Sequence, residues 1–178
     1  PVDGALTVNG LDASDVGSTS TALAAGFAIS RTDWSDAETV ITSVLTRATA
    51  TLSAGNCGTF GTPGTVTGAP VQTGLTTACY RYVLTGTNSV VPPALSLTTI
   101  VKLDTSLPGS GAFTVGGAVA SVAGGAANLA TGANFSVSSF TNYSDAQSGM
   151  ASNTFTRTTG VSTAGVCGGF DPATTVTL

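Results

Sequence analysis

Histidine is absent from this chain of 178 residues, and charged side chains are scarce. Lysine and arginine number five and aspartate and glutamate nine, so 8% of the residues are charged, against about a quarter in average soluble proteins. The lack of histidine excludes imidazole-based catalytic triads, imidazole metal ligands and histidine pH switches. The five scattered cations provide no basic surface, so we expect no nucleic-acid binding.

Long apolar runs are also missing. None approaches the roughly 18 to 20 residues of a membrane-spanning helix, so no membrane span is expected. Threonine, valine, serine and glycine are abundant instead. Threonine and valine favour pleated strands, and 23 glycines with 7 prolines provide frequent turns. The composition predicts an all-β protein of many short strands, and its low charge is typical of extracellular bacterial surface layers and fibres.

An internal repeat organises the chain. Residues 4–10 (GALTVNG) recur at 111–117 (GAFTVGG), and residues 33–37 (DWSDA) recur at 142–146 (NYSDA). Four further pairs fit the same order: 27–30 and 135–138, 46–47 and 156–157, 57–60 and 167–170, and 65–67 and 175–177. The offset grows from 107 to 110, as single-residue loop insertions would make it. We predict two tandem copies, copy one at 1–107 and copy two at 108–178.

Copy one is complete, whereas copy two holds only the N-terminal part of the repeat. Alternating apolar and polar residues predict strands in copy one at 5–8, 26–32, 39–49, 78–85 and 95–103. The counterparts of 78–103 in copy two would lie beyond Leu178, so we expect copy two to be completed by later sequence or by another chain. The number of strands and the spacing of turns predict immunoglobulin-like β-sandwiches.

Five segments of copy one together resemble a known family. These segments are 4–10, 31–37, 57–61, 79–87 and 98–105, and they are similar to bacterial immunoglobulin-like repeats. Residues 88–94 depart from that pattern, because a polar hairpin is replaced by SVVPP. The resemblance implies tandem immunoglobulin-like β-sandwiches within a large secreted or cell-surface protein. It implies a structural or adhesive array and no enzymatic activity.

The three cysteines divide between the copies. Cys57 and Cys79 lie within copy one and are expected to form a disulfide in an oxidising compartment, with free thiols as the alternative. Cys167 is the counterpart of Cys57, and the counterpart of Cys79 would lie past the last residue. We therefore expect Cys167 to be unpaired or to form an intermolecular bond.

A small group of carboxylates is a candidate metal site. Asp33 and Asp36 share one loop, and Asp104 from the predicted linker at 104–109 could complete a calcium site of carboxylate oxygens. The alternative is turn chemistry, in which each aspartate caps its own backbone. No other cofactor is expected.

These observations favour a structural, non-enzymatic repeat unit of an extracellular bacterial fibre or surface stalk. Its expected partners are copies of itself or neighbouring repeats, joined in part by strand complementation. The alternative is an adhesin or a carbohydrate- or protein-binding module that uses the loops at one end of the sandwich. Exposed aromatic residues beside Trp34 would favour that alternative, although core packing of Trp34 is expected. Asn134 and Asn142 begin glycosylation sequons, which matter only in a host that glycosylates.

Overall fold

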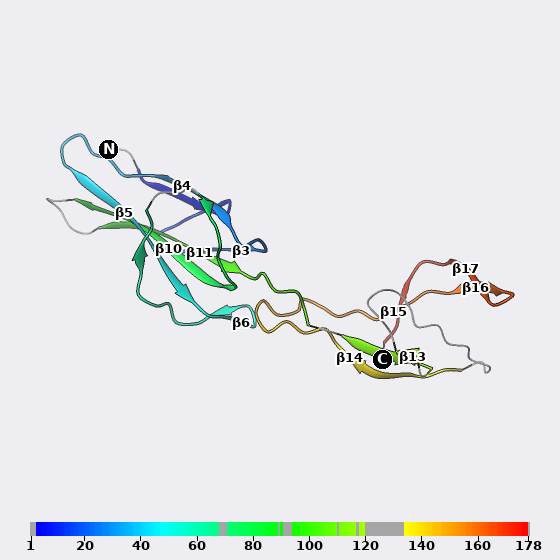
Figure 1. Cartoon of the computed structure of the whole chain (residues 1–178). Helices are drawn as coiled ribbons and strands as arrows, with labels where there is room; N and C mark the ends of the chain where they lie inside the picture. Colours follow the sequence, from blue (N-terminus) through cyan, green and yellow to red (C-terminus); the bar gives the residue numbers. More distant parts are fainter. Residues whose placement is uncertain are drawn as a thin grey trace. The chain divides into compact units, whose positions relative to one another are not determined.

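The computed structural model describes residues 3–67, 71–88, 90, 94–109, 111–116, 118–119 and 134–177 (Figure 1). Every regular element in these ranges is a β-strand, which confirms the all-β prediction. The chain forms two units. The first comprises Pro1–Leu107 with Ala146–Gly149, and the second comprises Pro108–Asp145 with Met150–Leu178.

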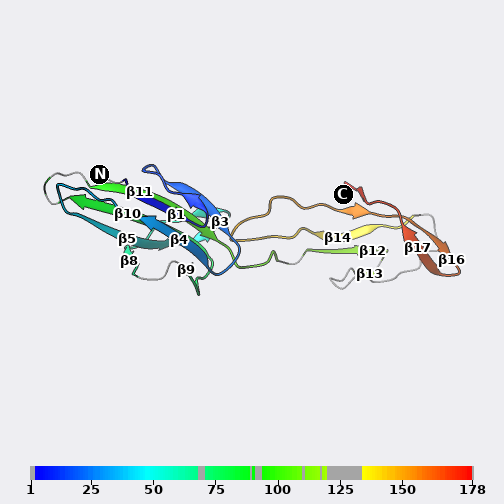
Figure 2. The same cartoon turned by 90° about the horizontal axis from the view of Figure 1, so that it is seen from above.

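Two sheets build the first unit. One has the strand order β2 (Leu11–Asp12), β1 (Ala5–Val8), β4 (Phe27–Thr32) and β9 (Val71–Gln72). The other has the order β3 (Ser18–Ala22), β11 (Leu95–Leu103), β10 (Ala78–Asn88), β5 (Ile41–Ala50) and β8 (Gly64–Thr65). The described pairs are antiparallel except β3 with β11, which is parallel (Figure 2). A short hairpin of β6 (Leu52–Ser53) and β7 (Asn56–Cys57) follows β5.

One hydrophobic core lies between these two sheets, because both contribute their apolar faces. Its buried members are Leu6, Val8, Ala22, Phe27, Ile29, Trp34, Leu45, Ala78, Tyr80, Tyr82, Leu84, Val101 and Leu103. The Tyr82 side chain is fully buried, and its ring meets that of Phe27 edge to face at 5.9 Å between centroids. Two sheets around one core are compatible with a β-sandwich.

The predicted alternation of β10 is confirmed, since Tyr80, Tyr82 and Leu84 all lie buried on its core face. The strand extends three residues beyond the predicted end, to Asn88. Cys79 on the opposite face is also fully buried, which alternation alone does not predict. It belongs to a second small core that Ala50 and Leu52 share, with Cys57 and Phe60 packed against it.

The second unit has three small sheets of described strands. They are β13 (Ala118–Val119), β12 (Ala112–Val115) and β14 (Val137–Thr141); β15 (Thr156–Arg157) with β18 (Thr174–Thr175); and β16 (Gly160–Thr163) with β17 (Val166–Phe170).

Strand pairings of the first unit recur in the second. The pairs Val8↔Leu11, Thr46↔Thr65 and Leu52↔Cys57 return as Val115↔Ala118, Thr156↔Thr175 and Ser162↔Cys167. Each recurrence has the offset that the sequence alignment of the copies gives. At these three pairs the local structure of copy two therefore follows that of copy one.

One of the increases in the offset between the two copies comes from a β-bulge and not from the expected loop insertion. The register of β12 with β14 shifts between Ala112 and Thr114, and Ser139 adopts a φ of 53° there. β4, the counterpart of β14, pairs with β1 without interruption. A single extra residue in β14 thus raises the offset from 108 to 109 inside a strand.

Candidate functional site

The disulfide between Cys57 and Cys79 marks the most cross-connected region of the first unit, and its presence confirms the predicted pairing. It joins β7 to β10, with 5.7 Å between the two Cα atoms and a sequence separation of 22. The small hairpin of β6 and β7 has only two paired positions of its own. The disulfide therefore fixes this hairpin to the long central strand β10.

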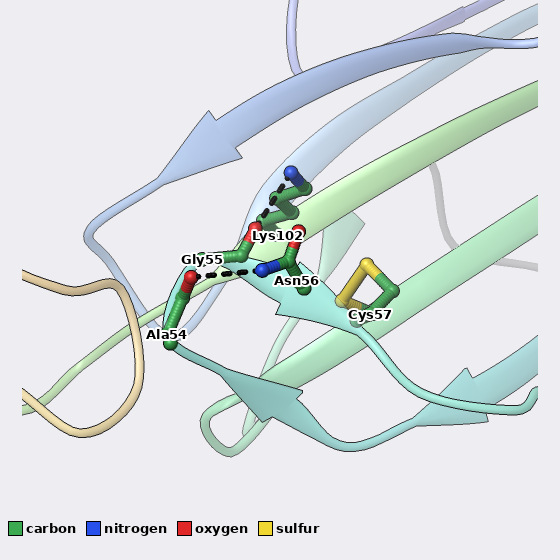
Figure 3. The surroundings of a disulfide bond; sticks show 6 residues. Ala54, Gly55, Asn56, Cys57 and Lys102 are labelled. Carbon is green, nitrogen blue, oxygen red and sulfur yellow. Dashed lines mark hydrogen bonds between the residues drawn. A yellow bond between two sulfur atoms is a disulfide. The ribbon is translucent and has the colours of Figure 1, made fainter.

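The turn between β6 and β7 is held from two further directions (Figure 3). Ala54 and Gly55 form the turn with φ values of 46° and 75°, a left-handed conformation that suits glycine and is uncommon for alanine. The Lys102 ammonium on β11 donates a hydrogen bond of 2.8 Å to the Gly55 carbonyl, and the Asn56 amide donates one of 3.1 Å to the Ala54 carbonyl. These bonds hold the turn in its shape.

Segment Ala146–Gly149 completes this region of the first unit. The Ala54 N–H donates to the Ala146 carbonyl at 3.0 Å, and the Gly55 N–H donates to the Gln147 carbonyl at 2.7 Å. The turn thus gives both its N–H groups to one segment more than 90 residues away in sequence. Sequence reasoning missed this contact, because no local pattern signals it.

Asp104 anchors the same segment. Its side chain is 5% exposed, and its carboxylate accepts hydrogen bonds from the Ser148 N–H at 3.0 Å and the Ser106 N–H at 2.9 Å. Burial by itself raises the pKa of this carboxyl, but the hydrogen bonds from Ser106 and Ser148 outweigh it and lower the pKa from 3.8 to about 2. Asp104 is therefore a charged structural anchor at the end of β11.

Acidification is expected to weaken the first unit through Asp104. Because the folded pKa of about 2 lies below the ordinary value, this stabilisation is complete above about pH 4 and is lost as the pH falls towards 2. Replacing Asp104 by asparagine should lower the free energy of unfolding by about 1–2 kcal/mol at pH 7 and flatten its dependence between pH 4 and 2. Urea unfolding followed by Trp34 fluorescence measures both effects.

The exposed Asp15 supplies a matched control. An Asp15→Asn variant should keep the wild-type dependence between pH 4 and 2. An Asp104→Asn variant with the same acid dependence as the wild type would contradict the anchoring role of Asp104.

The carboxylates weighed as a calcium site each have protein partners. Asp33 forms an ion pair with Arg31 at 3.4 Å, and Asp36 accepts hydrogen bonds from the Glu38 N–H at 3.3 Å and the Thr39 hydroxyl at 3.0 Å. The Glu38 N–H, followed by the Thr39 hydroxyl, lowers the pKa of Asp36. Within the described ranges, no three histidine, cysteine, aspartate or glutamate side chains gather as a metal site would require. Calcium binding stays a prediction.

Three of the remaining predicted site residues belong to the second unit, and Trp34 belongs to the first. Cys167 is a free, exposed thiol on β17, and Asn134 and Asn142 are both exposed. Trp34 is buried, as expected, with its ring against Gly4 and Gly86. In the part of the chain that the structure describes, no helix has the length and apolarity to cross a membrane.

The second unit contains an apolar cavity that sequence reasoning missed. Its volume is about 240 Å³, and its apolar lining includes Phe113, Phe140, Tyr143, Met150 and Phe155. Phe155 meets Phe113 and Phe140 edge to face, with 5.1 and 5.9 Å between ring centroids. The signal in the sequence was the set of aromatic residues at core positions of copy two.

Comparison with known proteins adds no relative. No family model, no curated protein and no solved structure matches this chain. Its function is therefore argued from its own residues.

Proposed function

We propose that this chain is a structural, non-enzymatic unit of an extracellular bacterial fibre or surface stalk, built from tandem immunoglobulin-like repeats. Support comes from strand pairings that recur in both units at the offsets of the sequence repeat, as expected of repeated modules. The disulfide is in keeping with a secreted protein or a cell-surface location.

The observation that carries the proposal is the parallel pairing of β3 with β11. Five residue pairs join these strands, from Thr99↔Ser18 to Leu103↔Ala22. A stretching force between the N-terminus of the first unit and Leu107 passes through β1 and β2, then loads β3 from its N-terminal side and leaves β11 at its C-terminal end. In parallel strands these two ends are opposite, so the force loads the hydrogen bonds in shear and they must break together. Such an arrangement suits a unit that carries tension.

The burial of Trp34 favours this proposal over the adhesive alternative. Trp34 is 8% exposed, so it offers no ring face to a ligand at that end of the first unit. A binding module that uses aromatic stacking would expose such a residue.

Single-molecule pulling of the full chain tests the proposal. We expect the first unit to unfold in one discrete event, because the β3–β11 bonds share the load. Reducing the disulfide should lengthen the released chain by about 70 Å, since 22 residue steps of roughly 3.6 Å become extensible in place of the 5.7 Å between the cysteines. Smooth extension without a discrete event would overturn the proposal.

Proline variants in β3 provide a matched pair for that experiment. Neighbouring residues of a strand point their N–H groups to opposite sides, and β3 lies at the edge of its sheet. One of the variants Thr19→Pro and Ser20→Pro therefore removes a bond to β11, while the other points away from the ladder. The two variants are expected to differ clearly in unfolding force. The variant that removes a bond to β11 should unfold at a lower force than the wild type.

A further inference from the structure

Two aromatic core positions that are buried in the first unit are exposed at their counterparts in the second. Trp34 is 8% exposed and its counterpart Tyr143 is 50% exposed. Phe27 is 5% exposed, whereas Phe135 is 57% exposed. The second unit thus presents aromatic side chains of the type that the first unit encloses.

Strand β10 encloses these positions in the first unit. Its Gly86 lies directly beneath the Trp34 ring, where an added Cβ would come within 2.6 Å of Cε3. The rings of Tyr80 and Tyr82 pack edge to face against Phe27 at 6.5 and 5.9 Å. Alternate residues of β10 therefore cover the core. Glycine stands at position 86, where the Trp34 indole leaves no room for a side chain.

The second unit has the corresponding half of this arrangement. Gly111 packs against one face of Tyr143, where an added Cβ would lie 2.7 Å from Cδ2, as Gly4 packs against Trp34. Tyr143 also lines the apolar cavity, together with Phe113, Phe140 and Phe155. Its lining residues Tyr143 and Phe155 are the counterparts of Trp34 and Leu45, which lie next to Gly86 and Leu84 of β10 in the first unit.

Strand β15 follows directly after Phe155, which lines the cavity. In the first unit β5 pairs with β8 on one side and with β10 on the other, where Arg47 lies opposite Tyr82. Its counterpart β15 pairs with β18 at the equivalent positions, and within the described residues β15 has no second strand. Thr156 and Arg157 are both exposed. An unpaired edge beside an uncovered apolar face is a template for strand addition.

We propose that the cavity and the edge of β15 form a binding site for one extended β-strand with the pattern of β10. The required pattern has large apolar side chains at two alternate positions and glycine at the next. By equivalence with β10, the residue in the Tyr82 position lies opposite Arg157 and the residue in the Leu84 position lies opposite Phe155. The glycine lies against Tyr143. This inference rests on the equivalence of the two copies and not on the tension-bearing function.

A peptide with the sequence of residues 77–89, carrying serine in place of Cys79, tests the site on the intact chain. We expect saturable binding to one site, with new hydrogen-exchange protection at Thr156 and Arg157. A peptide with valine in place of Gly86 should bind about tenfold more weakly or worse, because its side chain overlaps the Tyr143 ring. The control changes only the peptide, so the fold of the protein is unaffected.

Cys167 provides a readout of register. Cys79 pairs with Cys57 in the first unit, and Cys167 is the counterpart of Cys57. A peptide that keeps Cys79 as a mixed disulfide with thiopyridine should react with Cys167. The Cys167 thiolate attacks the peptide sulfur, a new disulfide forms and thiopyridone leaves with the electron pair of the broken bond. Moving the peptide cysteine to the position of Tyr80 should slow this capture.

Three outcomes would overturn the proposal. One is equal binding of the glycine and valine peptides. The second is protection confined to the first unit, which would mean that the peptide exchanges with β10. The third is dimerisation of the chain that covers the cavity with a surface other than a β10-like strand and excludes the peptide. A failed pulling experiment leaves peptide capture unaffected, so this proposal and the proposed function are tested separately.

Discussion

Replacing Trp34 by alanine is expected to lower the free energy of unfolding of the first unit by about 4 kcal/mol. The indole is buried between Gly4 and Gly86, two glycines that leave room for it, so no neighbouring side chain can fill the space left behind. Large-to-small changes at such sites cost about 3–5 kcal/mol, because apolar burial is lost and a cavity stays. Hydrogen exchange of β10 and β11 amides under native conditions reports the change.

The chain contains its own control for this variant. Tyr143 occupies the counterpart position and is 50% exposed, so Tyr143→Ala should change the stability of the second unit by less than about 1 kcal/mol. Comparable losses for the two variants would contradict the view that one position is enclosed and the other open. Addition of the residue 77–89 peptide should raise the cost of Tyr143→Ala, because the bound strand would cover the ring.

Loss of the disulfide is expected to have the second-largest effect. A Cys57→Ser, Cys79→Ser double variant should be about 3 kcal/mol less stable, since the bond closes a loop of 22 residue steps in the unfolded chain. The hairpin of β6 and β7 should lose its order before the main sheets, because the disulfide fixes it to β10. Exchange of the Asn56 amide compared with β10 amides separates the local effect from the global one.

Cys167→Ser supplies the control for the cysteine variants. Cys167 is exposed and free, so the first unit should keep its full stability in this variant. Equal stability of the double variant and the wild type would show that packing alone holds the hairpin.

Much of the first unit could be predicted from its sequence, because its signals are local. Alternation located the buried face of β10, and two cysteines within copy one pointed to the disulfide. The start of β5 was less well marked. Val40 continues the alternating pattern, yet β5 begins at Ile41 and Val40 is 76% exposed. Pattern alone does not tell where pairing with β10 begins, since that depends on the partner strand.

The features that escaped prediction depend on contacts between distant residues. Asp104 reads as a linker residue, yet it is buried because Ser106 and Ser148 supply its carboxylate with donors. The cavity of the second unit is marked in the sequence only by aromatic residues at core positions. Phe155 aligns with the buried Leu45, so both have the pattern of core residues. Only the structure shows that one of them lines a cavity.

The parallel pairing of β3 with β11 has a consequence for how the first unit folds. Thr99 and Ser18 are 81 residues apart, and the Thr99 hydroxyl reaches the Ser18 carbonyl. Contacts of such long sequence separation close slowly, because the entropy of a large loop must be lost before the pairing compensates for it. Strand β3 cannot take its place at the edge of the sheet until β11, its pairing partner, has been synthesised. A nascent chain that ends before Leu95 therefore lacks its closing strand, and the unit completes itself only after nearly all of copy one is available.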